Sequence, residues 1–513
     1  MIASSRLRLI FAASLLGSLV GCSTHGPDST ASAPVADSDR VPSKKETILL
    51  RALPRSIRDA VVMSDEEWLR MRVQVPSRFR PALYRRKSAV DFQIADIPLG
   101  HMLFNEFDPY PLHKIKLNPN ASAEAKRCWN VFVSGGIDCD ATPPPPSANA
   151  YVNGELDLLL YSREVAQSIG MLKATETLRD EMIKLDARGG QLESDVQHAA
   201  RDKSFKVEGS VVNMSKEERA KTGIFVVFGI DVSGNSQNRE LIRRAAQVAG
   251  TLGFSTHLLN TEPAVSYEHN GRLIAEQIRA QLPKLDRAII VAASKGVADS
   301  LTALLTSGPE MSYEERTKIR LLVALSGVVR ESFIAHWISE QKSAIPFVLR
   351  RAMPFMDRDL LHGNPLEGIN ALAKSPWSKF QVTDLKALYP NLRWISFSML
   401  PDGPDGYPNL SKMGSFMQKH AYKQHAWASP GDGLVETAAT FLPPGTGLTQ
   451  EIVRGSGQHA LAFGRFLEGT HVAPQQQEGR AKLNPEAGSE ILDSFLRSLP
   501  MSHIQDPNEV TAR

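Results

Sequence analysis

Residues 287–296 read RAIIVAASKG, and the residues that follow favour a helix that begins at Lys295. The apolar run predicts a strand buried on both faces of a sheet. Ser294 then stands in a sharp turn between strand and helix, which demands small flanking residues such as Ala292 and Gly296. Such a turn exposes the hydroxyl at the carboxyl edge of the sheet, where a base can activate it. The alternative is a serine that only caps the helix.

The chain around this turn alternates between predicted strands and predicted helices. Five further strands are expected at residues 224–228, 255–259, 319–325, 391–399 and 451–454, with helices near 239–252, 270–282 and 295–305. Strands that alternate with helices of this length predict an α/β fold with a mainly parallel sheet wound on both faces.

Two later segments carry groups that suit a hydroxyl nucleophile. Gly431-Asp432-Gly433-Leu434-Val435 offers a carboxylate between two glycines, with apolar residues to anchor it. The alternative for this segment is an ordinary surface turn, and the rival acids are Asp402 and Asp405. His459 follows the last predicted strand in the glycine-bordered stretch Gly457-Gln458-His459. A lone histidine is more often structural than catalytic, but its position in this order favours a base.

The order of serine, acid and histidine resembles the α/β-hydrolase superfamily, and the Asp432 loop is most similar to lipases and esterases. The resemblance covers about residues 223–496. It implies that Ser294 is the nucleophile, that His459 is general base and then acid, and that Asp432 orients the imidazole.

The oxyanion that forms in acyl transfer requires backbone N–H donors. The N–H of Lys295 lies at a helix start, where donors are free and the helix dipole favours negative charge. The resemblance implies a second donor in the loop after the strand at 224–228, which makes Gly229 or Ile230 the candidates.

The sequence departs from the family pattern at two positions. Ala292 replaces the first glycine of Gly-x-Ser-x-Gly, and Phe228-Gly229 stands where a His-Gly oxyanion sequence would be. Both departures leave open whether the site is active.

Residues 330–390 interrupt the alternation with a predicted helical insertion rich in methionine and phenylalanine. In an α/β hydrolase, an insertion after this strand is where a cap or lid sits. The alternative is an extra packing layer that does not move.

The N-terminus resembles a bacterial lipoprotein signal. Arg6 and Arg8 precede an apolar stretch at 9–20 that ends before Cys22. Lipidation of Cys22 would hold the mature protein on a membrane surface. Ser23 favours the outer membrane by resemblance to the sorting rule, on the side facing the periplasm. The alternative is an ordinary secretory signal with an incidental cysteine.

The chain is therefore divided into five predicted parts. A signal peptide at 1–21 is followed by a flexible tether at 22–45 and an N-terminal accessory region at 46–220, whose fold the sequence does not assign. Within this region residues 162–203 are expected to be largely helical. The α/β-hydrolase domain with its cap insertion spans 221–500, and a tail spans 501–513.

Cys128 and Cys139 remain once Cys22 is lipidated. They bracket residues 129–136, which are predicted to form a strand followed by a turn. In an oxidising compartment the pair predicts a disulfide that closes a short loop. Two free buried thiols are the alternative.

Composition excludes several classes of partner. The 513 residues are 42% hydrophobic and 22% charged, which is typical of a folded protein. Loss of Arg6 and Arg8 lowers the formal charge from +3 to +1, and no basic block supports nucleic-acid binding. Neither a metal-ligand cluster nor a phosphate-binding glycine loop is evident, so we predict no metal and no cofactor.

These features favour a membrane-anchored serine hydrolase that cleaves carboxylic esters, with a lipid or acyl ester as substrate. One alternative is a non-catalytic envelope lipoprotein that uses a degenerate hydrolase scaffold for binding. Another keeps the triad but transfers acyl groups to an acceptor other than water, or cleaves a thioester or a peptide.

Overall fold

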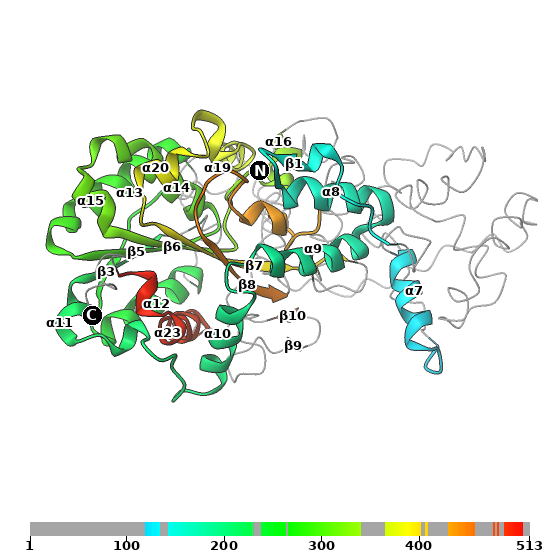
Figure 1. Cartoon of the computed structure of the whole chain (residues 1–513), viewed down its shortest axis with the longest axis horizontal. Coiled ribbons are helices and arrows are strands. Elements are labelled where there is room, and N and C mark those ends of the chain that lie inside the picture. The colour runs from blue at the N-terminus through cyan, green and yellow to red at the C-terminus, as the bar shows by residue number, and fades with distance from the viewer. Residues whose placement is uncertain are drawn as a thin grey trace, which may run out of the picture.

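The computed structural model describes residues 118–133, 142–227, 229, 237–262, 265–339, 365–401, 406–408, 429–456, 476–477, 480–481 and 487–505. Its centre is a sheet of six strands in the order β4-β3-β5-β6-β7-β8, in which every neighbouring pair is parallel (Figure 1). The strands are β3 Thr222–Val227, β4 Ser255–Leu258, β5 Arg287–Ala293, β6 Ile319–Leu325, β7 Arg393–Leu400 and β8 Gln450–Ser456. All six predicted strands are present, and the predicted α/β fold with a mainly parallel sheet is confirmed.

The side chains of the central strands alternate between two apolar cores, one on each face of the sheet. In β3, Ile224 and Val226 join the core of one face, whereas Phe225 and Val227 join the core of the other. Helices pack on both faces (Figure 1). One face is covered by α10 Gln191–Arg201, α12 Gln237–Thr251 and α23 Ala487–Ser498, and the other by α13 Tyr267–Gln281, α14 Lys295–Ser307 and α20 Asp384–Leu388. The parallel sheet is thus covered by helices on both faces, as the alternation of strands and helices in the sequence predicts.

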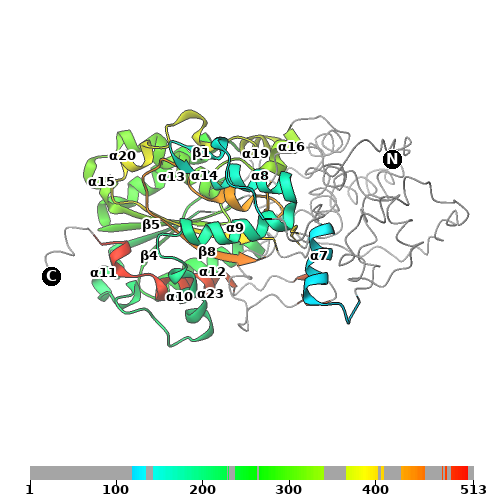
Figure 2. The same cartoon turned by 45° about the vertical axis from the view of Figure 1, so that its right-hand side comes forward.

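The described part of the N-terminal region contacts this sheet through several of its helices. It contains η3 Ala148–Ala150, β1 Tyr151–Val152, β2 Glu155–Leu156, α8 Leu158–Ile169, α9 Met171–Leu185, α10, η4 Val211–Asn213 and α11 Lys216–Ala220. The predicted helical character of residues 162–203 is confirmed. Leu192 and Val196 of α10 share one apolar core with the strands, and α9 lies beside β8 in both views (Figures 1 and 2).

The strand predicted at the start of residues 129–136 is wrong, because helix α7 spans Ala123–Val133. The hydroxyl of Ser122 accepts the backbone N–H of Ala125 at 3.0 Å and so caps the start of the helix. Residues 123–127, Ala-Glu-Ala-Lys-Arg, are strong helix formers. Their propensity carries the two valines of the last turn into the helix.

The predicted insertion is helical where the structure describes it. Its elements are α16 Phe333–Ser339, α19 Pro365–Leu372, η8 Pro376–Lys379 and α20. Trp377 and Tyr389 belong to the core that also holds α14. The indole N–H of Trp377 donates to the carbonyl of Val329 at 3.0 Å. The hydroxyl of Tyr389 donates to the carbonyl of Leu304 at 2.8 Å. Residues 376–389 therefore pack against α14 and the turn after β6, and a lid role for the insertion stays a prediction.

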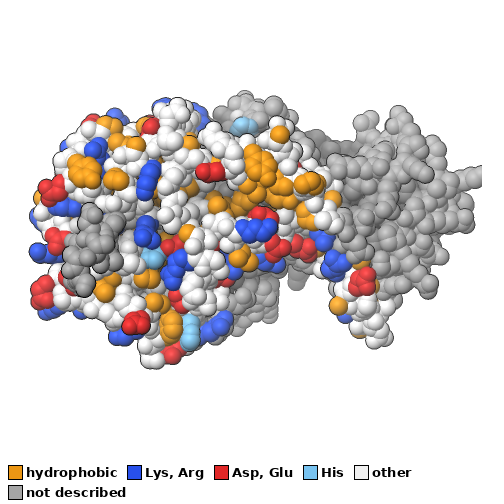
Figure 3. Space-filling model, in the orientation of Figure 1, with side chains coloured by type: hydrophobic (Ala, Val, Ile, Leu, Met, Phe, Trp, Pro, Cys, Tyr) orange, Lys and Arg blue, Asp and Glu red, His pale blue; other side chains and the backbone are white. Residues whose placement is uncertain are grey.

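The remaining described elements are short. They are η5 Leu282–Lys284, η6 Gly308–Glu310, α15 Tyr313–Lys318, η9 Thr437–Thr440, β9 Gln476–Gln477, β10 Arg480–Ala481 and η11 Met501–His503. None of the described helices has the length and apolarity that crossing a bilayer demands. On the face drawn in Figure 3, charges of both signs are interspersed and hydrophobic side chains gather over β1 and α8.

Candidate active site

Ser294 occupies the turn between β5 and α14 in a strained backbone conformation. Its φ is +52° and its ψ is −125°, a region that L-residues rarely adopt. Ala293 and Lys295 are buried on either side, whereas Ser294 is partly exposed. Its side chain makes no capping hydrogen bond to α14, so the alternative of a helix-capping serine is wrong. Strain at an exposed serine between a strand and a helix is typical of a nucleophile elbow.

The turn after β6 holds this elbow in place. The backbone N–H of Ser294 donates to the carbonyl of Leu325 at 3.0 Å, and the N–H of Val328 donates to the carbonyl of Ser294 at 3.1 Å. Gly327 lies so close to α14 that a Cβ there would come within 2.4 Å of a Val297 methyl. The backbone of Ser294 is therefore held by β6 and the turn that follows it.

The loop after β3 approaches Ser294 closely. A Cβ built on Gly229 would lie 2.7 Å from the Cβ of Ser294, 2.9 Å from the carbonyl oxygen of Ala293 and 3.3 Å from the Ser294 hydroxyl oxygen. Only glycine fits at this distance. The structure thus brings together Ser294 and one predicted oxyanion donor, and Lys295 adds the free N–H of a helix start.

Asp432 is buried, with 1% of its surface exposed, so the surface-turn alternative is wrong. Its Oδ1 accepts the backbone N–H groups of Leu434 at 3.0 Å and Val435 at 2.9 Å. Gly433 has a φ of +104°, and a Cβ on Gly431 would lie 2.3 Å from the carbonyl of Val435. Both glycines are therefore required by the conformation of this loop.

The loop that carries Asp432, residues 429–440, is called the acid loop. The turn after β6 joins this loop to the turn at Ser294. The backbone N–H groups of Val329 and Arg330 donate to the carbonyl of Ala439 at 3.3 and 3.2 Å. The hydroxyl of Thr437 donates to the carbonyl of Met399 near the end of β7. Val328, the preceding residue of the turn after β6, donates its N–H to the Ser294 carbonyl. The serine and the acid loop therefore lie at one edge of the sheet.

The predicted base stays a prediction. β8 ends at Ser456, which pairs with Leu400 at the carboxyl end of β7, so the chain enters the segment of His459 from the same edge. Several predictions fall on residues outside those that the structure describes: His459, Ile230, Cys22, Cys139, the rival acids Asp402 and Asp405, and the signal peptide and tether at 1–45. Cys128 is buried in α7, and its predicted disulfide stays a prediction.

A charged cluster lies buried behind the elbow, and sequence reasoning missed it. The ammonium of Lys295 binds both carboxylate oxygens of Asp299 at 2.8 and 2.9 Å, and the amide of Asn270 donates to the same carboxylate at 2.8 Å. The ammonium also lies 5.4 Å from the ring centre of Tyr267. Burial raises the pKa of Asp299 to about 6, although Lys295 and Asn270 both favour its charged form. The i,i+4 spacing of Lys295 and Asp299 was the available clue.

Replacement of Asp299 by asparagine is expected to destabilise the fold by about 3–5 kcal/mol, because it leaves the Lys295 charge buried without a partner. The double variant Lys295→Met/Asp299→Leu removes both charges and is expected to lose less. Urea unfolding of the three proteins measures the difference. A single variant within about 1 kcal/mol of wild type would contradict the expected coupling.

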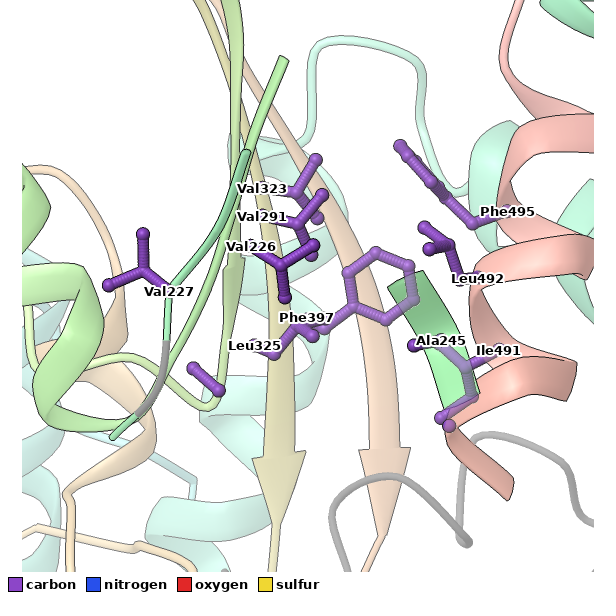
Figure 4. Close-up of a pocket in the computed structure, with 12 residues that line it drawn as sticks. Val226, Val227, Ala245, Val291, Val323, Leu325, Phe397, Ile491, Leu492 and Phe495 are labelled. Carbon is purple, nitrogen blue, oxygen red and sulfur yellow. The ribbon is translucent and has the colours of Figure 1, made fainter. Parts of the chain in front are cut away.

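Two cavities lie between the sheet and the helices that cover it or among those helices. A small apolar one, about 20 Å³, is enclosed between the sheet and α23, where Phe397, Leu492 and Phe495 line it (Figure 4). It has room for about one water molecule. A larger one, about 700 Å³, lies between α13, α14 and residues 367–380. The larger cavity has the size of a small-molecule site, and both polar and apolar groups line it.

Within the part of the chain that the structure describes, no three His, Cys, Asp or Glu side chains are placed to hold a metal ion. The groups that the structure places at this edge of the sheet are the Ser294 hydroxyl, backbone N–H groups and the buried carboxylate of Asp432.

No family model and no curated protein matches the chain. Several solved structures resemble it weakly. The metagenomic carboxyl esterase MGS0156 has 18% identity and a TM-score of 0.37, over 54% of this chain and 75% of its own. Bacillus licheniformis lipase BlEst2 in its mature form has 16% identity and a TM-score of 0.32, over 51% and 91%. Phospholipase PlaB from Legionella pneumophila has 12% identity and a TM-score of 0.27, over 44% and 45%. The α/β fold is shown by the strand order of the parallel sheet and by the turn at Ser294 between β5 and α14.

Proposed function

We propose that this protein is a serine hydrolase that cleaves carboxylic esters through an acyl-enzyme. One observation carries the proposal: a strained, partly exposed serine between β5 and α14, with the backbone of Gly229 packed against it. This pairs a nucleophile with a backbone that can receive negative charge. The buried carboxylate of Asp432 at the same edge supplies the acid of the proposed Ser-His-Asp triad.

In the first half-reaction the Ser294 hydroxyl attacks the ester carbonyl while the imidazole of His459 takes its proton. The oxyanion is stabilised by the backbone N–H of Lys295 and by that of Gly229 or Ile230. Asp432 orients the imidazole and stabilises its charged form. Collapse of the tetrahedral intermediate expels the alcohol, which receives the proton from His459 and leaves the acyl group on Ser294.

In the second half-reaction His459 activates a water molecule, which attacks the acyl-enzyme. Collapse of this intermediate releases the carboxylic acid and returns the proton to Ser294. The proposal extends to acyl or lipid esters as substrates, because the sequence carries a lipobox-like Cys22 that would hold the enzyme at a bacterial membrane. The expected location is the outer membrane, facing the periplasm.

The nucleophile is tested with a fluorophosphonate probe on the folded full-length protein. Ser294 is expected to displace fluoride and carry the phosphonyl group, which peptide mapping by mass spectrometry locates. In parallel, p-nitrophenyl esters of graded chain length measure turnover and the length of acyl chain that the site accepts. Absence of both labelling and turnover would refute the hydrolase and favour the non-catalytic lipoprotein.

A further inference from the structure

The acid loop is closed by a second buried carboxylate, that of Glu436. Asp432 and Val435 are joined by a backbone hydrogen bond of 3.0 Å, and Gly431 pairs with Glu436 in an isolated antiparallel bridge. The Oε1 of Glu436 accepts the backbone N–H of Ser429 at 2.8 Å and its hydroxyl at 2.9 Å. Only 1% of the surface of Glu436 is exposed. The carboxylate thus ties both ends of the loop that presents Asp432.

Arg163 of α8 neutralises this carboxylate. Its Nε and Nη2 donate to Oε1 and Oε2 of Glu436 at 3.1 and 2.6 Å, the two-pronged geometry that gives the strongest ion pairs. A second acid, Glu331, lies 3.6 Å from Nη2. A buried carboxylate without such a partner is strongly unfavourable. The position of the acid loop therefore depends on a helix that precedes the whole parallel sheet in the chain.

The helix itself is fastened to the turn that holds the nucleophile. Asp157 caps the start of α8 by accepting the N–H groups of Leu159 and Leu160 at 2.9 and 3.2 Å. Its two oxygens also accept hydrogen bonds from Arg330 at 2.9 and 2.6 Å. Arg330 belongs to the turn after β6, two residues beyond the N–H that binds the Ser294 carbonyl. The start of α8 is therefore joined through Asp157 to the turn after β6, which supports Ser294. Its second turn is joined through Arg163 to the acid loop.

A further contact holds the acid loop to the segment after β6. The hydroxyl of Ser332 donates to the carbonyl of Leu434 at 2.6 Å. Leu434 is also one of the two residues whose N–H groups bind the Asp432 carboxylate. The loop is thus braced from two sides, by Ser332 near Asp432 and by Arg163 at its closing residue.

We propose that Arg163 is a positioning residue for the triad acid, and that α8 is a working part of the catalytic fold. The inference rests on the proposed function for its kinetic meaning. Without the guanidinium, Glu436 must find water or another partner. The loop then shifts, and Asp432 no longer faces the imidazole of His459 in the productive geometry.

The test compares Arg163→Met with Arg163→Lys and with a matched control, Arg497→Met. Arg497 is equally buried and joins α23 to the carbonyls of Ala199, Asp202 and Phe205, away from the acid loop. Arg163→Met is expected to lower kcat by about 10- to 100-fold with little change in KM, since a misplacement of about 1 Å costs that much. Arg163→Lys is expected to keep most of the activity, and added guanidinium to restore part of it to Arg163→Met. Arg497→Met is expected to lose stability with kcat unchanged.

The pH profile distinguishes positioning from a merely structural role. A displaced Asp432 stabilises the imidazolium less, so the pKa of His459 falls and the acidic limb of kcat/KM moves to lower pH. Only the Arg163→Met profile is expected to move. A folded Arg163→Met protein with wild-type kcat and an unmoved profile would overturn the inference.

Hydrogen exchange gives a readout that needs no activity. In Arg163→Met the amides of Leu434 and Val435 are expected to exchange at least about 10-fold faster than in Arg497→Met, because the loop opens more often. Equal exchange in the two variants would overturn the inference even if the protein hydrolyses no ester. If the wild type shows neither turnover nor labelling while exchange is selectively accelerated, the proposed function fails and the positioning of the loop stands. Should Arg163→Met fail to fold, hydrogen exchange in Arg163→Lys takes its place: a single ammonium cannot reproduce the two-pronged contact, so the amides of Leu434 and Val435 are expected to exchange faster than in the wild type, and unchanged exchange would overturn the inference.

Discussion

Ser294→Ala is expected to lower kcat for ester hydrolysis by about 10⁴- to 10⁶-fold, which is the loss typical of a triad nucleophile. Alanine removes the oxygen that forms the acyl-enzyme and leaves the neighbouring backbone hydrogen bonds available. KM is therefore expected to change little, and the fluorophosphonate label to disappear. Turnover of a p-nitrophenyl ester and intact-protein mass spectrometry measure the two effects.

The control is Ser307→Ala, at the other end of α14. The Ser307 hydroxyl donates to the carbonyl of Ala303 and lies about three and a half turns of helix away from Ser294. This variant is expected to keep full activity and full labelling. Retention of turnover in Ser294→Ala would assign the chemistry to another residue. If labelling and turnover are absent in the wild type and every phenotype survives Ser294→Ala, the scaffold serves binding instead.

Gly229→Ala is expected to lower kcat by about 10²- to 10³-fold, the loss associated with an oxyanion donor. The added methyl would lie 2.7 Å from the Cβ of Ser294 and 2.9 Å from the Ala293 carbonyl, both of which are held by the strand and turn. Neither can move away without disturbing the elbow. The loop must retreat, and the N–H donors near Gly229 leave the position of the oxyanion. Steady-state kinetics with the best ester from the chain-length series measure this loss.

Gly250→Ala is the matched control. Gly250 lies in α12, and a Cβ there meets nothing nearer than the Thr256 hydroxyl oxygen at 3.9 Å. Alanine is expected to be tolerated or to stabilise the helix by up to about 1 kcal/mol. Activity of Gly229→Ala within about threefold of Gly250→Ala would mean that the loop after β3 does not take part in oxyanion binding.

Local patterns were enough to predict the sheet. The short, continuous apolar run before Ser294, rich in β-branched residues, favoured a strand buried on both faces, and the structure shows alternate residues in two cores. Local patterns failed at α7, where residues 129–133 favoured a strand by their own composition. The cap at Ser122 and the helix formers after it outweighed that preference.

Sequence reasoning anticipated the candidate site unevenly. The glycines around Asp432 and the small residues around Ser294 are local steric requirements, so they can be read from a short stretch. The buried pair of Lys295 and Asp299 had an i,i+4 spacing, but spacing alone does not distinguish a buried pair from a solvated one. The pairing of Arg163 with Glu436 joins residues 273 positions apart and left no local trace.

The sequence by itself determined the strands, the turn that strains Ser294 and the order of serine, acid and histidine. Each depends on neighbours in the chain, through hydrophobic periodicity and the steric limits of tight turns. Only the tertiary structure decided that Gly229 packs against Ser294 and that α8 is joined both to the turn after β6 and to the loop of Asp432. Contacts of that kind depend on which surfaces meet when the helices pack on the sheet. The partner of a buried charge is the oppositely charged group that this packing places beside it.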